Sequence, residues 1–214
     1  GVDAHGRVSP DAVAQAVAGG RLLTLGWGNG EIGVLQPVAE VAAALAELPA
    51  SERPLLHTDA VQVVGVEDLD VGAVPVDLLT LSGHKLGAPP GIGALFVRRD
   101  VTLTPLVHGG PQERERRAGT ENLLGIIGFG VAAKLARQDR EARVHRVRSL
   151  RERLWSHLSP ACGPVDRYDE EPSLPGTLSV GFRGLRGDAL LVALDAVGVA
   201  ASTGSACAAG APEP

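Results

Sequence analysis

Asp59 and the run Ser82-Gly83-His84-Lys85 combine a carboxylate, a hydroxyl, an imidazole and an amine within a short stretch of chain. A lysine amine can lose its proton and condense with an aldehyde, whereas an arginine guanidinium stays protonated. Lys85 and Lys134 are the only lysines among 20 basic residues, so Lys85 is an exception in a chain that otherwise uses arginine. A carboxylate can keep a pyridine nitrogen protonated, and a hydroxyl and an imidazole can bind phosphate oxygens. Together these groups favour a site for pyridoxal phosphate (PLP).

A plainer interpretation of the same residues is structural. Ser82–Lys85 would then form a polar turn between two buried strands, and Asp59 would cap its own backbone. The order of the neighbouring residues favours the cofactor site, because Asp59-Ala-Val-Gln62 precedes the turn and Gly91-Ile-Gly-Ala-Leu-Phe-Val97 follows it.

Short apolar strands must position these side chains. The pattern predicts strands over 54–58, which ends at Asp59, and over 76–81, which ends at Ser82. Further strands are predicted over 21–25 and 92–97, with one helix after Ser9-Pro10 and another after Pro37. Strands that alternate with helices predict a mainly parallel sheet, and ligands bind such sheets at the carboxyl ends of the strands.

The second half of the chain is predicted to be mostly helical at first. From about Thr120 a long helical stretch begins, and apolar residues at 144, 147, 150, 154 and 158 keep a helical spacing. A strand over 178–182 and a helix over 188–197 follow. The expected fold is therefore α/β: residues 1–138 as part of a large PLP domain with a mainly parallel sheet, and residues 139–214 as a smaller α+β lobe joined by the long helix.

The composition excludes several classes of function. A net charge of −5 and 3% aromatic residues argue against nucleic-acid binding, and no apolar run is long enough for a membrane span. Cys162 and Cys207 lie far apart with no metal-ligand spacing, so we expect neither a metal site nor a disulfide framework, and a cytoplasmic location. The chain has no methionine, and we therefore expect it to be a piece of a longer protein.

The sequence resembles the cysteine desulfurases within the class V aminotransferase family over nearly all 214 residues. The segments that carry the resemblance are Gly30-Glu-Ile-Gly-Val-Leu-Gln-Pro37, His57-Thr-Asp-Ala-Val-Gln62, Ser82-Gly-His-Lys85, Pro89-Pro-Gly-Ile-Gly-Ala-Leu-Phe-Val-Arg-Arg99, Gly109-Gly-Pro-Gln-Glu-Arg114, Arg117-Ala-Gly-Thr-Glu-Asn122 and Ser202-Thr-Gly-Ser-Ala-Cys207.

The resemblance implies a role for each polar residue near the turn. Lys85 would bind PLP covalently, Asp59 would meet its ring nitrogen, and Gln62 would hydrogen-bond its phenolic oxygen. Ser82 and His84 would bind its phosphate.

The resemblance also implies partners. Thr120 would reach the cofactor phosphate of a partner subunit, which makes the enzyme a homodimer. Cys207 would take sulfur from L-cysteine as a persulfide, release L-alanine, and pass the sulfur to an acceptor or scaffold protein for iron–sulfur cluster or thiocofactor assembly.

The chain departs from the family in three places. Asn29-Gly30-Glu31 stands where the family usually has Asn-Asn-Glu, so position 30 lacks an amide that normally contacts cofactor and substrate. The segment that precedes Gly1 in the family is absent, as is the substrate-binding arginine that lies beyond Pro214. We therefore expect a chain that is incomplete at both ends and inactive alone.

Two alternatives to a cysteine desulfurase stay open. The chain could be a selenocysteine lyase or another class V enzyme, which keeps the cofactor and changes the substrate. It could instead be a non-catalytic remnant that only binds a partner.

Overall fold

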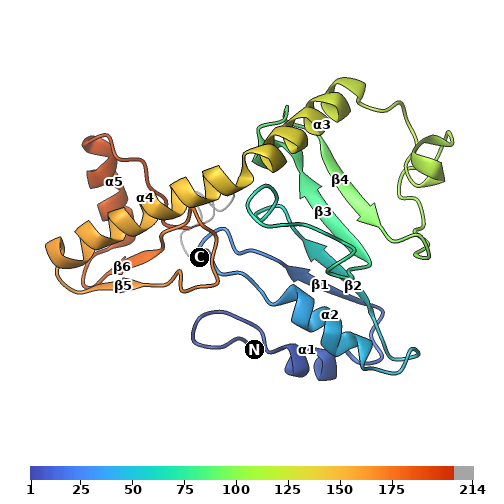
Figure 1. Cartoon of the computed structure of the whole chain (residues 1–214), viewed down its shortest axis with the longest axis horizontal. Coiled ribbons are helices and arrows are strands. Elements are labelled where there is room, and N and C mark those ends of the chain that lie inside the picture. Colours follow the sequence, from blue (N-terminus) through green and yellow to red (C-terminus); the bar gives the residue numbers. More distant parts are fainter. Residues whose placement is uncertain (205–214) are drawn as a thin grey trace.

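The computed structural model describes residues 1–204, and a four-stranded sheet organises the first half of them (Figure 1). The strands stand in the order β1 (Leu22–Gly26), β2 (Leu55–Asp59), β3 (Leu78–Ser82) and β4 (Gly93–Val97). The first three strands are parallel, and β4 runs antiparallel to β3. The predicted α/β fold with a mainly parallel sheet is therefore confirmed, and each predicted strand lies within two residues of an observed one.

One face of this sheet packs against two short helices and forms the core. These helices are α1 (Pro10–Val17), where Ser9 accepts a hydrogen bond from the backbone N–H of Ala12, and α2 (Val38–Ala46). The buried core residues include Val41 and Leu45 of α2, Leu56 of β2 and Leu79 of β3. Along β2 burial alternates, so Leu56 and Thr58 are buried while Leu55 and Asp59 are exposed. The opposite face of the sheet is therefore the one on which Asp59 is accessible.

Two helices that meet at Asp139 connect the sheet to the rest of the chain. They are α3 (Leu123–Gln138) and α4 (Arg140–Ala161). Asp139 caps both helices, with φ −100° and ψ 3°, where the sequence pattern predicts one uninterrupted stretch. The 22 residues of α4 span about 33 Å, and this helix leads away from the four-stranded sheet towards the C-terminal elements (Figure 1).

The second half also contains a small antiparallel sheet and a helix. The sheet pairs β5 (Val165–Arg167) with β6 (Val180–Phe182), and α5 (Gly187–Ala196) follows. The strand and helix predicted over 178–182 and 188–197 are confirmed in position, whereas β5 was not predicted. The division of the chain at 138/139 into a large domain and a lobe stays a prediction.

Among residues 1–204, none of the helices combines the length and the apolar character that a membrane span requires.

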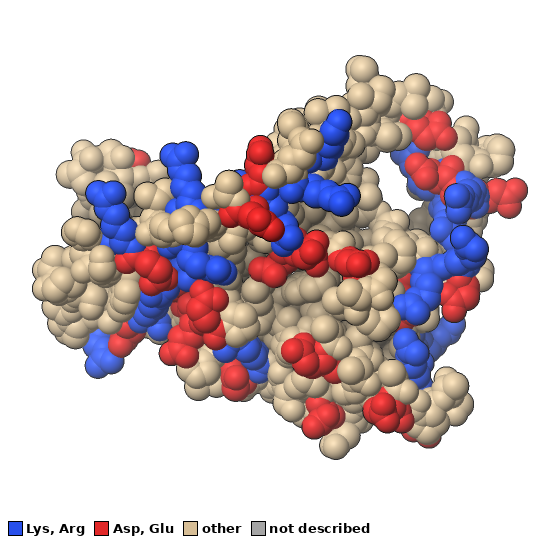
Figure 2. Space-filling view, in the orientation of Figure 1, with Lys and Arg blue, Asp and Glu red and all other residues tan. Residues whose placement is uncertain are grey.

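An arginine is the buried residue of α4. Leu150 and Leu154 of the predicted apolar stripe are 52% and 51% exposed, whereas the Arg151 side chain is only 3% exposed. Arg151 donates to Glu171 (2.6 Å), to Ser173 (2.7 Å) and to the carbonyl of Leu174, and it lies 3.6 Å from the buried carboxylate of Asp169. A buried guanidinium needs such partners, because an unpaired charge is costly to remove from water. Figure 2 shows the basic and acidic side chains interleaved along α4.

The segment that Arg151 holds also bonds to the first half of the chain. The N–H of Leu174 donates to the carbonyl of Gly33 at 2.7 Å, and the N–H of Leu35 donates to the carbonyl of Pro172 at 3.2 Å. Residues 172–174 thus fix the loop that follows β1, and α4 is connected through them to that loop.

Low pH is expected to weaken the ion pair between Glu152 and Arg167. Arg167 donates to both oxygens of this carboxylate, at 2.7 and 2.8 Å, and this pairing lowers the pKa of Glu152 from 4.5 to about 2. A folded-state pKa below the unfolded one means that the contribution to stability is present above pH 4.5 and is lost as the pH falls towards 2. Urea unfolding should show that the deficit of Glu152→Gln against the parent shrinks between pH 6 and pH 3.

Glu141→Gln is the matched control for this experiment, since Glu141 is exposed on the same helix. A Glu152→Gln deficit that stays constant across this pH range would contradict the assignment.

Candidate active site

The pairing register brings Asp59 and Ser82 to one edge and one face of the larger sheet. Asp59 lies opposite Gly26 on β1 and Thr80 on β3. Side chains of paired residues in a parallel sheet point to the same face, as do residues two apart on one strand. Ser82, two residues beyond Thr80, therefore shares the face of Asp59 at the carboxyl end of the sheet.

A tight turn follows Ser82 and carries Lys85. Residues 83–86 form a single 3₁₀ turn, η1 (Gly83–Leu86), which ends at Gly87 with φ 82°. The N–H of Gly87 donates to the carbonyls of Gly83 and His84, and the N–H of Gly83 donates to Ile92 at 2.9 Å. A left-handed φ favours glycine at position 87, so this residue type lets the chain turn here. The backbone of Lys85 is fixed by these bonds, while its side chain is exposed.

Ser82 and His84 form a hydrogen-bonded pair at the start of this turn. The Ser82 hydroxyl and His84 Nδ1 are 2.7 Å apart. Such a pair presents a hydroxyl and an imidazole to one ligand group, and α3 packs against the turn that holds them. The sequence predicts both residues in one site, and in the structure their side chains are in direct contact.

Asp59 uses one carboxylate oxygen for its own backbone. Oδ1 accepts a hydrogen bond from the N–H of Val61 at 2.9 Å, which is the capping contact of the plainer interpretation. Oδ2 has no hydrogen-bond partner among residues 1–204, and the side chain is exposed. The carboxylate can therefore cap the turn and still accept a hydrogen bond from a ligand.

Gln62 follows Asp59 by three residues and packs against the loop that follows β1. The N–H of Trp27 donates to the carbonyl of Asp59 at 2.9 Å and holds this loop at the end of β2. The Gln62 amide packs so closely on Gly30 that a Cβ built at position 30 would lie 2.6 Å from its Nε2. Gly30 stands out in the sequence, but its contact with Gln62 cannot be predicted there, because no spacing rule relates residues 30 and 62.

The two other predicted residues are not brought to this edge by any described contact. Thr120 is exposed in the loop between η2 (Gln112–Glu115) and α3, and none of the hydrogen bonds among the described residues joins it to Asp59 or Ser82. Cys207 lies outside the described residues.

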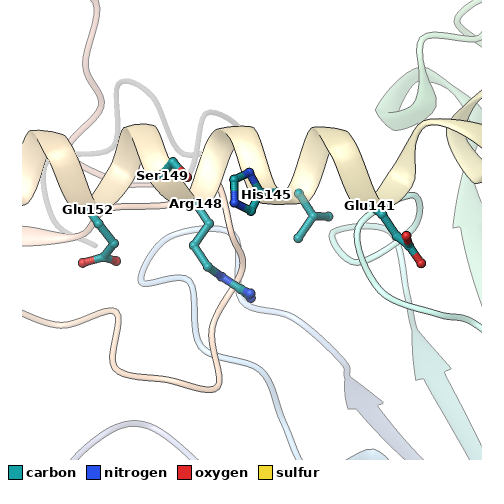
Figure 3. A pocket seen from close by; sticks show the side chains of 6 residues that line it. Glu141, His145, Arg148, Ser149 and Glu152 are labelled. Carbon is teal, nitrogen blue, oxygen red and sulfur yellow. The ribbon is translucent and has the colours of Figure 1, made fainter.

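Two hollows in the surface do not coincide with this edge. One of about 490 Å³ lies along α4 and is lined by Glu141, Val144, His145, Arg148, Ser149 and Glu152 (Figure 3). Another of about 230 Å³ lies in the loop over 105–115. Neither is lined by Asp59, Gln62, Ser82 or Lys85. The hollow along α4 is a groove on one helix face. The candidate site is instead the sheet edge, where Asp59 and Ser82 share one face and the segments that follow them carry Gln62 and Lys85. Residues 1–204 contain no cluster of three potential metal ligands.

The sequence matches the Aminotransferase class-V family over residues 1–213. It is 48% identical to the cysteine desulfurase of Gluconacetobacter diazotrophicus over the whole chain, an alignment that covers 53% of that relative. It is also 40% identical to the IscS-like cysteine desulfurase of Mycobacterium tuberculosis, over 99% of the chain and 54% of the relative. The chain thus spans about half the length of the curated relatives it matches.

Solved structures of NifS-like proteins share the fold of this chain. A NifS-like protein superimposes with a TM-score of 0.87 and 33% identity, over 94% of this chain and 55% of that one. The NifS-like protein from Rickettsia africae also has a TM-score of 0.87, with 29% identity over 95% of this chain and 57% of the other.

Proposed function

The chain belongs to the class V aminotransferase family, and on this basis we propose that it serves PLP-dependent cysteine desulfuration. L-cysteine would be converted to L-alanine, and its sulfur would pass to Cys207 as a persulfide and then to an acceptor or scaffold protein. The relatives at 40–48% identity are named cysteine desulfurases, which supports this substrate. We also propose a homodimer, in which Thr120 serves the partner's site, and a cytoplasmic location.

The groups at the sheet edge suit PLP in number and in kind. Lys85 offers the amine that an aldehyde needs, Asp59 offers a carboxylate oxygen without a described partner, and the Ser82–His84 pair offers donors for a phosphate. When bound, PLP supplies an electron sink through its protonated ring. The register that sets Asp59 and Ser82 on one face, with Lys85 in the turn that follows, is the observation that carries the proposal.

Each residue would then have a separate task. Asp59 Oδ2 would accept the ring N–H and hold its proton in place, since an ionised carboxylate favours a nearby positive charge. Ser82 and His84 would orient the phosphate end. Lys85 Nζ would anchor the aldehyde carbon and, once released, accept and return a proton.

The sulfur step would belong to Cys207. Its thiolate would attack the sulfur of L-cysteine and form a sulfur–sulfur bond as the carbon–sulfur bond breaks. The electron pair of the broken bond would stay with the carbon, which takes up a proton and becomes the methyl group of alanine.

Asp59→Asn tests the cofactor role against the plain capping role. An amide cannot stabilise a ring cation, so the protonated fraction of bound ring nitrogen should fall about 10- to 1000-fold, and alanine release from L-cysteine should fall with it. The measurements, made in the full-length protein, are the absorbance spectrum of the PLP-loaded form and the rate of alanine release.

Asp70→Asn is a matched control, because Asp70 is exposed and makes the same type of contact, with its Oδ1 accepting from the N–H of Gly72 at 2.8 Å. If Asp59→Asn changes the thermal midpoint as Asp70→Asn does, and leaves spectrum and turnover unchanged, Asp59 only caps its turn and the proposal is wrong.

A further inference from the structure

Two arginines share the carboxylates of Glu152 and Asp169. Arg151 lies 2.9 Å from Glu152 and 3.6 Å from Asp169, and Arg167 lies 2.7 Å from Glu152 and 2.9 Å from Asp169. Asp169 is fully buried, so its charge needs a partner. Arg167 already supplies that partner at the shorter distance, and the burial of Arg151 therefore calls for a second explanation.

Arg151 alone of these two arginines also binds the segment that follows Asp169. Its Nη1 donates to the hydroxyl of Ser173 at 2.7 Å and to the carbonyl of Leu174 at 3.0 Å, and its Nη2 donates to Glu171 at 2.6 Å. Ser173 is 1% exposed, so these bonds are formed out of contact with water. One planar guanidinium thus fixes three residues of this segment at once.

Leu174 passes this constraint on to the first half of the chain. Its carbonyl accepts from Arg151, while its N–H donates to the carbonyl of Gly33 at 2.7 Å. Its side chain is 6% exposed and lies close to Gly28, where a Cβ would be 3.4 Å from Leu174 Cδ2. A shift of Leu174 would therefore displace the backbone at both glycines.

The segment so constrained, loop 27–36, lies against the carboxyl end of β2. The N–H of Trp27 donates to the carbonyl of Asp59 at 2.9 Å. A Cβ at Gly28 would lie 2.7 Å from Val63 Cγ1, so this backbone also packs on the turn that follows Asp59. Loop 27–36 thus borders the candidate site on the side opposite to the contacts with Leu174.

We propose that Arg151 is a positioning residue for the candidate site: through residues 172–174, its guanidinium sets where loop 27–36 lies beside Asp59. Lysine cannot replace it, because an ammonium group lacks the planar fork that reaches a hydroxyl, a carbonyl and a carboxylate together. The placement of the loop by Arg151 stands apart from the proposed function, whereas its consequence for the reaction rests on that function.

The first test follows Trp27 in the full-length protein labelled with 5-fluorotryptophan. Its ¹⁹F signal is identified by its loss in Trp27→Phe. The signal should shift in Arg151→Lys, and by less in Ser173→Ala, which removes one acceptor and leaves every charge in place. Ser173→Ala decides the matter if Arg151→Lys does not fold, because it removes a single oxygen atom.

Arg167→Lys is the matched control. It makes the same change in the other arginine that pairs with Glu152 and Asp169, and among the described residues Arg167 donates no hydrogen bond to residues 171–174. Its thermal midpoint should fall, since ion pairs are weakened, while the Trp27 signal stays in place.

The second test measures alanine release from L-cysteine at saturating PLP, at a temperature where each variant is folded. A misplacement of about 1 Å far from the chemistry can cost about 100-fold, so kcat should fall about 10- to 100-fold in Arg151→Lys. In Arg167→Lys, where loop 27–36 keeps its place, kcat should change by less than about 2-fold.

A Trp27 shift confined to Arg151→Lys and Ser173→Ala, with the fall in kcat, supports the proposal. A Trp27 signal that stays in place in both variants overturns it, and so does one that moves as far in Arg167→Lys. A selective shift with kcat at the parent value overturns the role in the reaction. If the parent releases no alanine, the proposed function fails, and the Trp27 signal still decides whether Arg151 positions the loop.

Discussion

In the full-length protein, Lys85→Ala is expected to abolish covalent attachment of PLP and to remove alanine release from L-cysteine. Lys85 is the only amine in the turn that follows β3, and its side chain is exposed. This turn begins directly after Ser82, which shares one face of the sheet with Asp59. The loss should exceed the 10²- to 10⁴-fold that a single proton-transfer group contributes, because the same nitrogen also anchors the cofactor.

Lys134→Ala is the matched control, since Lys134 is the other lysine of the chain and is exposed on α3. Borohydride reduction followed by mass spectrometry of the peptides shows which lysine carries the cofactor. Label on Lys134, or label that persists in Lys85→Ala, would refute the assignment.

In the full-length protein, Cys207→Ser is expected to lower alanine release by at least about 100-fold, which corresponds to about 2.7 kcal/mol of barrier. A serine hydroxyl is not ionised near neutral pH, so it cannot replace a thiolate as the group that accepts sulfur. PLP affinity should not change, and the two readouts together separate this variant from Lys85→Ala.

Cys162→Ser provides the comparison, because Cys162 is a free, exposed cysteine at the end of α4. Persulfide from unlabelled L-cysteine, detected by alkylation and mass spectrometry, should appear on Cys207 in the parent and in Cys162→Ser. Persulfide on Cys162 alone would reassign the acceptor.

The sequence predicted the carboxyl ends of β2 and β3 well, because the end of a strand depends on the residues immediately around it. Apolar runs that stop at Asp59 and Ser82 identify two strand ends, and parallel strands bring their carboxyl ends together whatever the rest of the fold. The turn that carries Lys85 follows from the next glycine and proline residues in the same way.

Other features depend on contacts between distant segments, which a periodic pattern does not contain. The burial of Arg151 depends on Asp169 and Ser173, which reach it only after the chain has turned through β5. By pattern alone Leu150 and Leu154 were better candidates for the core. The packing of Gln62 on Gly30 was missed for the same reason.

The backbone of the turn around Lys85 is already ordered before a ligand binds. The bonds of Gly83 and Gly87 already fix the backbone, so the amine explores only the torsions of its own side chain. A nucleophile tethered in this way behaves as if present at a very high effective molarity, which for well-oriented groups reaches about 10⁵ M or more. A small alkylamine supplied in solution to Lys85→Ala would therefore restore little of the lost reaction, even at the highest concentrations that the protein tolerates.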